Sequence, residues 1–584
     1  VFAMLASYVL SRTLVPTLAM YLLRRHDHHA APSDNPFVLL QRGFERGFAR
    51  IREAYRGLLV RLLSRQGAFV SAFLAVCLVA WLLLPWLGEN FFPTSDNGQF
   101  ILHLRAKTGT RIEETARLAD LVEASIRREI PARELEGIID NIGMPYSTIN
   151  TIYSRSGFIG AADADILVTL GKNRRPTEDH MRALRRRLPE EFPGVTFYFV
   201  PADIVTQILN FGLPAPIDVQ IEGSNLEGNR QVANKMLAEL RRVPGLTDLR
   251  IQQNFDSPTL EVSVDRTKAA GAGFTPRDVA NSVLLTLSGS GQTNPATFLN
   301  WQNGVSYSLV TQAPQYSVQS LQDIQNIPLG GATPDSRPQI LGDVASIERG
   351  NGMAVISHYN TRRVVDIYGS VQDRDLGAVG RDIARIVDAN RAHLPRGSFM
   401  TLRGQVETMQ ASYLGLLGGL AFAIVLVYLL IVVNFQSWLD PFIIISALPA
   451  ALAGIIVFLF LTQTTLSVPA LMGAIMCMGV GTANSILVVS FARERLAAHG
   501  DAREAAIEAG FTRFRPVLMT ALAMIIGMIP MALAMGEGGE QNAPLGRAVI
   551  GGLVCATIAT LIFVPAVFSL LHGGRRPAAA ERAA

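Results

Sequence analysis

Cysteine is scarce in this 584-residue chain, which contains only Cys77, Cys477 and Cys555, each within an apolar stretch. The long hydrophilic middle has none, and this excludes a disulfide framework, a cysteine-based zinc site and a thiol redox centre there. Charged residues are also few, at 17% of the chain with a formal net charge of +4. That balance gives no electrostatic case for nucleic-acid binding.

Catalytic motifs are missing as well. No P-loop, HExxH, GxSxG or GxGxxG pattern occurs, so we expect neither ATP hydrolysis by a P-loop nor another enzymatic activity. We also expect no cofactor and no bound catalytic metal. The methionines of the hydrophilic middle are scattered along the sequence, which does not favour a relay for soft metal ions.

Acidic and basic side chains are absent from four long runs, 408–439, 441–492, 516–536 and 548–572. A membrane-spanning helix needs about 20 mostly apolar residues, which excludes a purely soluble chain. Seven spans are predicted, over 1–23, 67–87, 409–433, 441–461, 468–492, 516–535 and 548–571.

Arginine marks one side of the membrane. Residues 24–66, 493–515 and 573–584 are rich in arginine, and alternation of the seven spans places all three on the same, cytoplasmic side. The stretch 88–407 then lies outside the cell membrane. Within 37–65, apolar residues recur every three or four positions with arginines between them, which is typical of an amphipathic helix in the interface; a soluble cytoplasmic helix is the alternative.

The external region repeats a strand–helix–strand pattern. Two units of this kind fit, one over 90–213 and one formed by 214–258 together with 358–406, with 259–357 as an insertion. The fold class is therefore a polytopic α-helical membrane protein with a large periplasmic α/β region of ferredoxin-like β-α-β subdomains and an inserted subdomain. The glycine-rich loop SRSGFIGA, 154–161, is either functional or an ordinary surface loop.

Several motifs resemble the resistance–nodulation–division (RND) efflux pumps: LGENFFPTSDNGQF, FQSWLDPFIIISALPAALAG, GVGTANSILVVSFARERL and RFRPVLMTALAMIIGMIP. The resemblance covers essentially the whole chain, in order, and favours the C-terminal half of the hydrophobe/amphiphile efflux type. It implies the following division: 1–23, last span of an N-terminal half; 24–66, cytoplasmic linker; 67–87, span; 88–213, first porter subdomain; 214–258 and 358–406, second porter subdomain; 259–357, docking subdomain; 407–572, five-helix membrane region; 573–584, cytoplasmic tail.

The resemblance also implies function and partners. Such pumps are homotrimers of the bacterial inner membrane that work with a periplasmic adaptor protein and an outer-membrane channel. They export hydrophobic or amphiphilic small molecules, driven by the proton-motive force. A loop that contacts substrate in these pumps matches Ser156, Gly157, Phe158, Ile159 and Gly160.

The proton relay of the family matches only in part. Its arginine, threonine and asparagine match Arg513, Thr520 and Asn484, whereas Ala483 stands where the family has a lysine. Its paired aspartates belong to a helix that this sequence does not include, and the membrane runs hold no carboxylate of their own.

Val1 falls within an apolar stretch, so we expect the chain to be a piece of a longer protein that does not pump alone. Two alternatives to drug export remain open. One is a non-transporting assembly or sensor protein of the RND type, and the other is an RND pump for metals or lipids.

Overall fold

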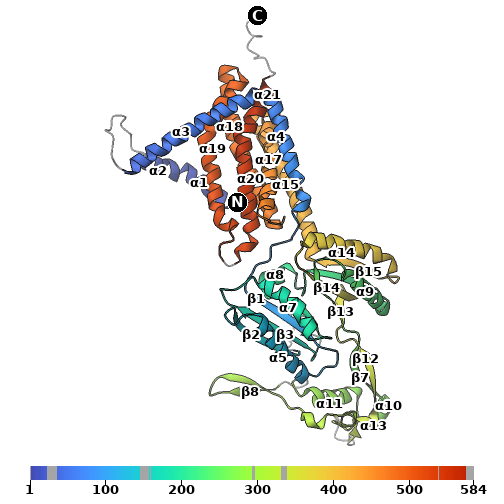
Figure 1. Cartoon of the computed structure of the whole chain (residues 1–584). Helices are drawn as coiled ribbons and strands as arrows, with labels where there is room; N and C mark the ends of the chain where they lie inside the picture. Colours follow the sequence, from blue (N-terminus) through green and yellow to red (C-terminus); the bar gives the residue numbers. More distant parts are fainter. Residues whose placement is uncertain are drawn as a thin grey trace.

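The computed structural model has an apolar helical bundle at one end and a large α/β region at the other (Figure 1). It describes residues 2–22, 36–144, 157, 160–291, 296–330, 339–536 and 538–573.

Six segments of the described chain are long and apolar enough to cross a membrane: Gln66–Trp86, Gln405–Phe435, Leu439–Leu461, Val468–Ala498, Ala502–Ala532 and Ala543–His572. They comprise α4 (Gln66–Trp81) with the short η1 (Leu84–Trp86), α15 (Gln405–Phe435), α16 (Leu439–Ile445), α17 (Leu448–Leu461), α18 (Val468–His499), α19 (Ala502–Ala532), α20 (Ala543–Ile558), the π-helical turn η5 (Ala559–Phe563) and α21 (Val564–His572). Over 2–22 the chain forms two shorter helices, α1 (Phe2–Arg12) and α2 (Leu14–Leu22), so the span expected at 1–23 stays a prediction.

The end of α18 and the start of α19 differ from the boundaries expected from the sequence. The loop expected over 493–515 is almost entirely helical, because α18 continues to His499 and α19 begins at Ala502. Gly500 ends α18 with a left-handed backbone (φ +76°), and the Asp501 side chain accepts a hydrogen bond from the Arg503 N–H at the start of α19. Gly500 and Asp501 are therefore sufficient to end α18 and to begin α19.

Glycines set the close approach of α20 to both α17 and α18. A Cβ at Gly454 would lie 2.5 Å from the Gly551 carbonyl oxygen, and a Cβ at Gly552 would lie 2.5 Å from the Cys477 sulfur. In a bilayer, burial of apolar surface gives helices no driving force to associate. Small residues instead let the helix backbones approach closely and pack.

Helix α3 (Pro36–Leu63) crosses the end of the bundle farthest from the α/β region (Figure 1). Tyr55, Leu59 and Leu63 are buried against the bundle, whereas Phe44 and Ile51 are exposed. An apolar face directed away from the protein is the pattern expected of an interfacial helix.

The first porter subdomain has the order β-α-β-β-α-β. Its elements are β1 (Gln99–Arg105), α5 (Ile112–Glu129), β2 (Leu135–Ile142), β3 (Asp163–Leu170), α7 (Thr177–Glu191) and β4 (Thr196–Val200). The antiparallel sheet has the strand order β2-β3-β1-β4, and α5 and α7 pack on its apolar core. This is the ferredoxin-like arrangement.

The second porter subdomain repeats this order with an insertion. It consists of β5 (Ile217–Glu222), α9 (Leu226–Leu240), β6 (Leu246–Ile251), β14 (Arg362–Val371), α14 (Leu376–Asn390) and β15 (Phe399–Gly404), with β13 (Ser357–Tyr359) paired to β14. The neighbours β6-β14-β5-β15 correspond one by one to β2-β3-β1-β4. Short helix α8 (Ile204–Leu209) links the two subdomains.

The insertion has a small core of its own. Its elements are β7 (Ser257–Val264), α10 (Arg266–Gly271), α11 (Pro276–Ser288), β8 (Ala296–Asn300), β9 (Val305–Leu309), η2 (Gln315–Ser317), α12 (Leu321–Gln325), β10 (Pro328–Leu329), β11 (Gln339–Ile340), α13 (Leu341–Val344) and β12 (Ala345–Gly352). After β12 the chain returns to the second subdomain at β13. The short helix η3 (Arg391–His393) belongs to that second subdomain and follows α14. The long pair β7–β12 connects this region to the second subdomain.

One short segment ties the membrane helices to the second subdomain. The Asn90 N–H donates to the Leu466 carbonyl, and the Asn90 side-chain oxygen accepts from the Leu376 N–H at the start of α14 (2.8 Å). Tyr413 of α15 donates to both the Asn90 and Leu466 carbonyls. Because these hydrogen bonds connect α14 to the membrane helices, a displacement of α14 would also displace the segment around Asn90 at the end of the bundle.

Candidate functional site

A polar centre lies within the apolar bundle, between α18, α19 and η5. The Thr520 hydroxyl donates to the Asn484 side-chain oxygen at 3.0 Å, and Asn484 is buried. The structure thus brings together two of the three residues expected in the relay. A buried amide within the membrane needs such a partner.

The polar centre extends to a residue that sequence reasoning missed. Thr560 is fully buried in η5, and its hydroxyl lies 2.9 Å from the Ser485 hydroxyl on α18. A hydroxyl inside the charge-free run 548–572 was the available signal, but threonine often only bonds to its own helix. Thr557, one turn earlier, does so by donating to the Leu553 carbonyl.

Arg513 stands apart from the pair formed by Asn484 and Thr520. Its guanidinium lies over the Phe491 ring at 5.0 Å, and its Nε atom is buried without a hydrogen-bond partner among the described residues. A buried, unpaired guanidinium N–H is costly and suits a carboxylate supplied from elsewhere. Ala483 lies on the exposed side of α18, next to buried Asn484.

In the periplasmic loop, Ser156, Phe158 and Ile159 lie outside the described residues, whereas Gly157 and Gly160 are described. The Gly157 carbonyl accepts hydrogen bonds from Arg105 Nη2 (3.0 Å) and Gln252 Nε2 (2.9 Å). Arg105 belongs to the first subdomain and Gln252 follows β6 of the second, so both subdomains hold this glycine. Its φ of +77° favours glycine.

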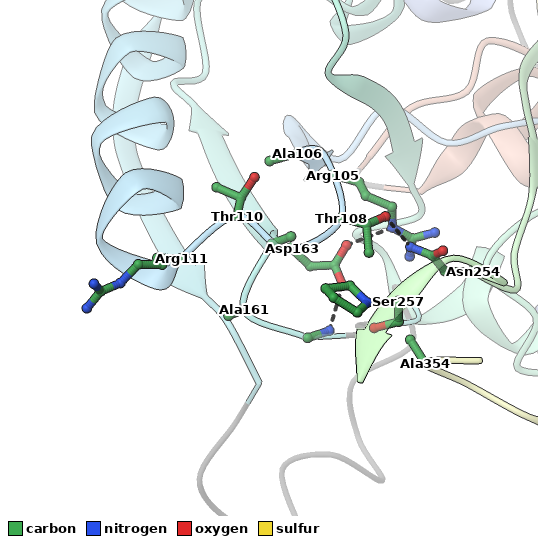
Figure 2. A pocket seen from close by; sticks show the side chains of 14 residues that line it. Arg105, Ala106, Thr108, Thr110, Arg111, Ala161, Asp163, Asn254, Ser257 and Ala354 are labelled. Carbon is green, nitrogen blue, oxygen red and sulfur yellow. Dashed lines mark hydrogen bonds and ion pairs between the residues drawn. The ribbon is translucent and has the colours of Figure 1, made fainter. Parts of the chain in front are cut away.

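A cavity of about 260 Å³ lies beside these contacts, between the first subdomain and the start of β7 (Figure 2). Its lining combines Arg105 and Arg111 with neutral groups such as Thr108, Asn254 and Ser257. Arg105 is held by an ion pair of its Nε with Asp163 Oδ1 at 2.7 Å, and Asn254 donates to the Thr108 hydroxyl.

Asp163 is the centre of a buried charge cluster at the wall of this cavity. Burial alone would raise the pKa of its carboxyl, but the hydrogen bond from His103 and the charge of Arg105 hold that pKa well below its usual range. His103 Nε2 lies 3.1 Å from Asp163 Oδ1, and its Nδ1 lies 2.6 Å from Asp165 Oδ1. The Asp163 carboxylate also accepts from the Gly160 N–H.

The described residues contain no group of three or more His, Cys, Asp and Glu side chains that could hold a metal ion. Most of the described methionines in the α/β region are packing residues. Met236 and Met400 belong to the apolar core of the second subdomain, Met181 packs against the core of the first, and Met144 is exposed.

The architecture defines a class: a membrane protein with several membrane-spanning helices, two ferredoxin-like subdomains and a further subdomain inserted in the second. The model of the AcrB/AcrD/AcrF family matches residues 1–572, and the chain belongs to this family of the RND superfamily.

Several relatives are named for metal resistance. The chain is 28% identical to the nickel-cobalt-cadmium resistance protein NccA of Alcaligenes xylosoxydans xylosoxydans, over 97% of this chain and 51% of that protein. It is also 28% identical to the cobalt-zinc-cadmium resistance protein CzcA of Cupriavidus metallidurans, over 98% and 52%. A crystal structure of a heavy metal efflux pump superposes with a TM-score of 0.75 at 26% identity, covering 91% of this chain and 52% of that one.

The chain therefore spans about half the length of the relatives it matches. The substrates in their names are metal ions, which differs from the hydrophobe/amphiphile type expected from the motifs.

Proposed function

We propose that this chain forms the porter and membrane part of a secondary active exporter of divalent transition-metal cations. The observation that carries the proposal is its continuous similarity, over 97–98% of its length, to the proteins named for nickel, cobalt, zinc and cadmium resistance. We propose further that it works as a trimer with a periplasmic adaptor and an outer-membrane channel.

In this proposal, proton influx through the polar centre drives export. Asn484 and Thr520 form the part of the relay within this chain, and Arg513 offers an unpaired N–H to a carboxylate on another helix. The four charge-free runs hold no carboxylate, and the buried Asp440 at the start of α16 is already paired with Arg493 and His572, so in this proposal the titrating group comes from outside the runs. The junction at Asn90 carries the resulting movement to the second porter subdomain.

The test uses inverted inner-membrane vesicles containing the protein as its gene encodes it. With an imposed pH gradient, we expect uptake of Zn²⁺, Co²⁺, Cd²⁺ or Ni²⁺ that is lost when the gradient is collapsed. Thr520→Val removes the hydroxyl at similar volume and is expected to reduce the rate at least about 10-fold, as for loss of a proton-transfer group. Thr557→Val, whose hydroxyl bonds only to its own helix, is the matched control.

A second candidate is export of amphiphilic organic molecules. The cavity in Figure 2 favours it, because its one lining carboxylate, Asp163, is already paired with Arg105, so the lining offers no unpaired carboxylate to a metal ion. Gradient-dependent movement of an amphiphilic dye, with none of the four metal ions moved, would support this candidate and exclude the first. Movement of neither would favour an assembly or sensor role.

A further inference from the structure

Pro565 leaves a defect in the last membrane helix. In an α-helix the N–H of each residue donates to the carbonyl four positions earlier, and proline has no N–H and crowds that carbonyl. Four positions before Pro565 is Leu561, so the Leu561 carbonyl lacks its usual donor. The defect lies in the buried core of the bundle, where an unpaired carbonyl is costly.

The helix departs from α geometry at this point. Ala559–Phe563 forms the π-helical turn η5, and α-helix resumes at Val564. Single π-turns inside α-helices are rare and occur frequently at functional sites.

Tyr55 of the interfacial helix α3 supplies the missing donor. Its hydroxyl donates to the Leu561 carbonyl at 2.7 Å across 506 residues of sequence. The ring is buried and stacks on Phe514 of α19 with centroids 4.7 Å apart. Gly510 leaves the space that the hydroxyl occupies, since a Cβ there would collide with it. Burial raises the pKa of Tyr55, so the hydroxyl stays protonated and remains a donor at physiological pH.

The same π-turn carries Thr560, which contacts Ser485 next to Asn484. A continuous set of contacts therefore runs from α3 through Tyr55 and Leu561 to Thr560 and the polar centre. We propose that Tyr55 is a positioning residue of the transporter, which holds the π-turn so that Thr560 meets α18 and thereby couples the interfacial helix to the polar centre. The consequence for transport rests on the proposed function, whereas the structural link does not.

The structural test is a double-mutant cycle read by hydrogen exchange of the 556–568 segment in the intact protein. Tyr55→Phe removes only the hydroxyl and keeps the stacking on Phe514. We expect roughly 5- to 30-fold faster exchange, the range for loss of one buried hydrogen bond. Pro565→Ala restores an N–H for the Leu561 carbonyl, and in that background Tyr55→Phe should change exchange by less than about 2-fold.

Tyr428→Phe is the matched control, because Tyr428 of α15 also donates to a backbone carbonyl, that of Trp438, but away from η5. It should leave exchange of the 556–568 segment unchanged. No effect of Tyr55→Phe, or an equal effect with and without Pro565, would overturn the proposal. If Tyr55→Phe could not be purified, recovery of its yield by Pro565→Ala would support the proposal and failure to recover would overturn it.

Transport gives the second readout. We expect Tyr55→Phe to lower the maximal rate about 5-fold or more with unchanged apparent affinity for substrate, and Pro565→Ala to restore it. If wild-type vesicles move no substrate, the proposed function fails while the exchange cycle still decides the link. If the exchange cycle succeeds but the rate of Tyr55→Phe equals that of the wild type, Tyr55 is structural only and the positioning role is overturned.

Discussion

The two porter subdomains have the same strand order, yet the buried carboxylates at their centres face different partners. In the first, the register of β1 and β3 sets His103 opposite Asp165 and Arg105 opposite Asp163, so each acid meets a base. In the second, the equivalent pair β5 and β14 sets Asp218 opposite Tyr368 and Gln220 opposite Asp366.

The pKa values of Asp163 and Asp218 differ in direction because of these surroundings. The pKa of Asp163 lies well below its usual range because of His103 and Arg105, in spite of its burial. Burial raises the pKa of Asp218 well above its usual value, the neighbouring Asp366 raises it further, and neither Asp218 oxygen has a hydrogen-bond partner among the described residues. One backbone arrangement therefore accommodates an acid whose neighbouring bases favour the ionised form and an acid whose burial and acidic neighbour favour the protonated form.

The largest effect is expected from Asp163→Asn. This change leaves Arg105 and His103 without their shared anion, and breaking a buried ion pair costs about 3–5 kcal/mol. We expect strongly increased hydrogen exchange in β1 and β3 and little change in β5 and β14. Asp165→Asn, at a side chain that is 13% exposed, is the control and should cost less. Equal losses in both subdomains would contradict their independence.

Acidification should change the contributions of Asp163 and Asp218 to stability in opposite directions. A lowered pKa contributes stability that is fully present above the unfolded pKa, about 4, and is lost as pH falls from there through the folded pKa. A raised pKa has the reverse effect, because the folded state keeps a proton that the unfolded state releases. From pH 7 to about 4 the second subdomain should therefore gain stability, and so should the first through Asp140 of β2, whose pKa burial and Glu123 raise to about 7. Below about pH 4 the first subdomain should lose the stability that Asp163 contributes. Exchange at several pH values, corrected for its intrinsic pH dependence, measures these trends, and a first subdomain that loses no stability below about pH 4 would refute the assignment of Asp163.

Asp218→Asn should act in the opposite direction to Asp163→Asn. It removes the cost of keeping a buried acid protonated at neutral pH, so we expect the second subdomain to gain stability at about pH 7. The pH dependence between 7 and 4 should also weaken. Destabilisation, with the pH dependence intact, would show that Asp218 is not the group whose raised pKa causes that dependence.

Much of this architecture could be predicted from sequence, but not the charge pairing. Alternation in 99–106, the apolar face of the helix expected over 111–128 and the repeat of strand and helix stretches after 214 indicated both β-α-β units. Strand β2 was missed because the pattern of LEGIIDNI shows little alternation, and none of its residues is fully buried. Arg105 and Asp163 are 58 residues apart, so only the register of the sheet brings them together.

The polar centre shows the same limit. Family motifs indicated Asn484 and Thr520, whose contact the structure contains, whereas Thr560 depends on a π-turn that hydrophobic periodicity cannot indicate. The function of the loop from Ser156 to Gly160 stays a prediction, supported only by the anchoring of Gly157.

The smallest effect is expected where the two subdomains meet at the surface. Arg182 of α7 forms an ion pair with Asp373 after β14, with side-chain exposures of 33% and 57%. Exposed pairs of this kind contribute about 0–1 kcal/mol and are screened by salt. Arg182→Gln should therefore change exchange in either subdomain only slightly, and the difference should vanish in roughly 1 M salt, where the Debye length is about 3 Å. A large effect that persists in salt would mean that the two subdomains unfold as one unit. The stability changes caused by Asp163→Asn and Asp218→Asn would then appear in both subdomains together and could not be assigned to one of them.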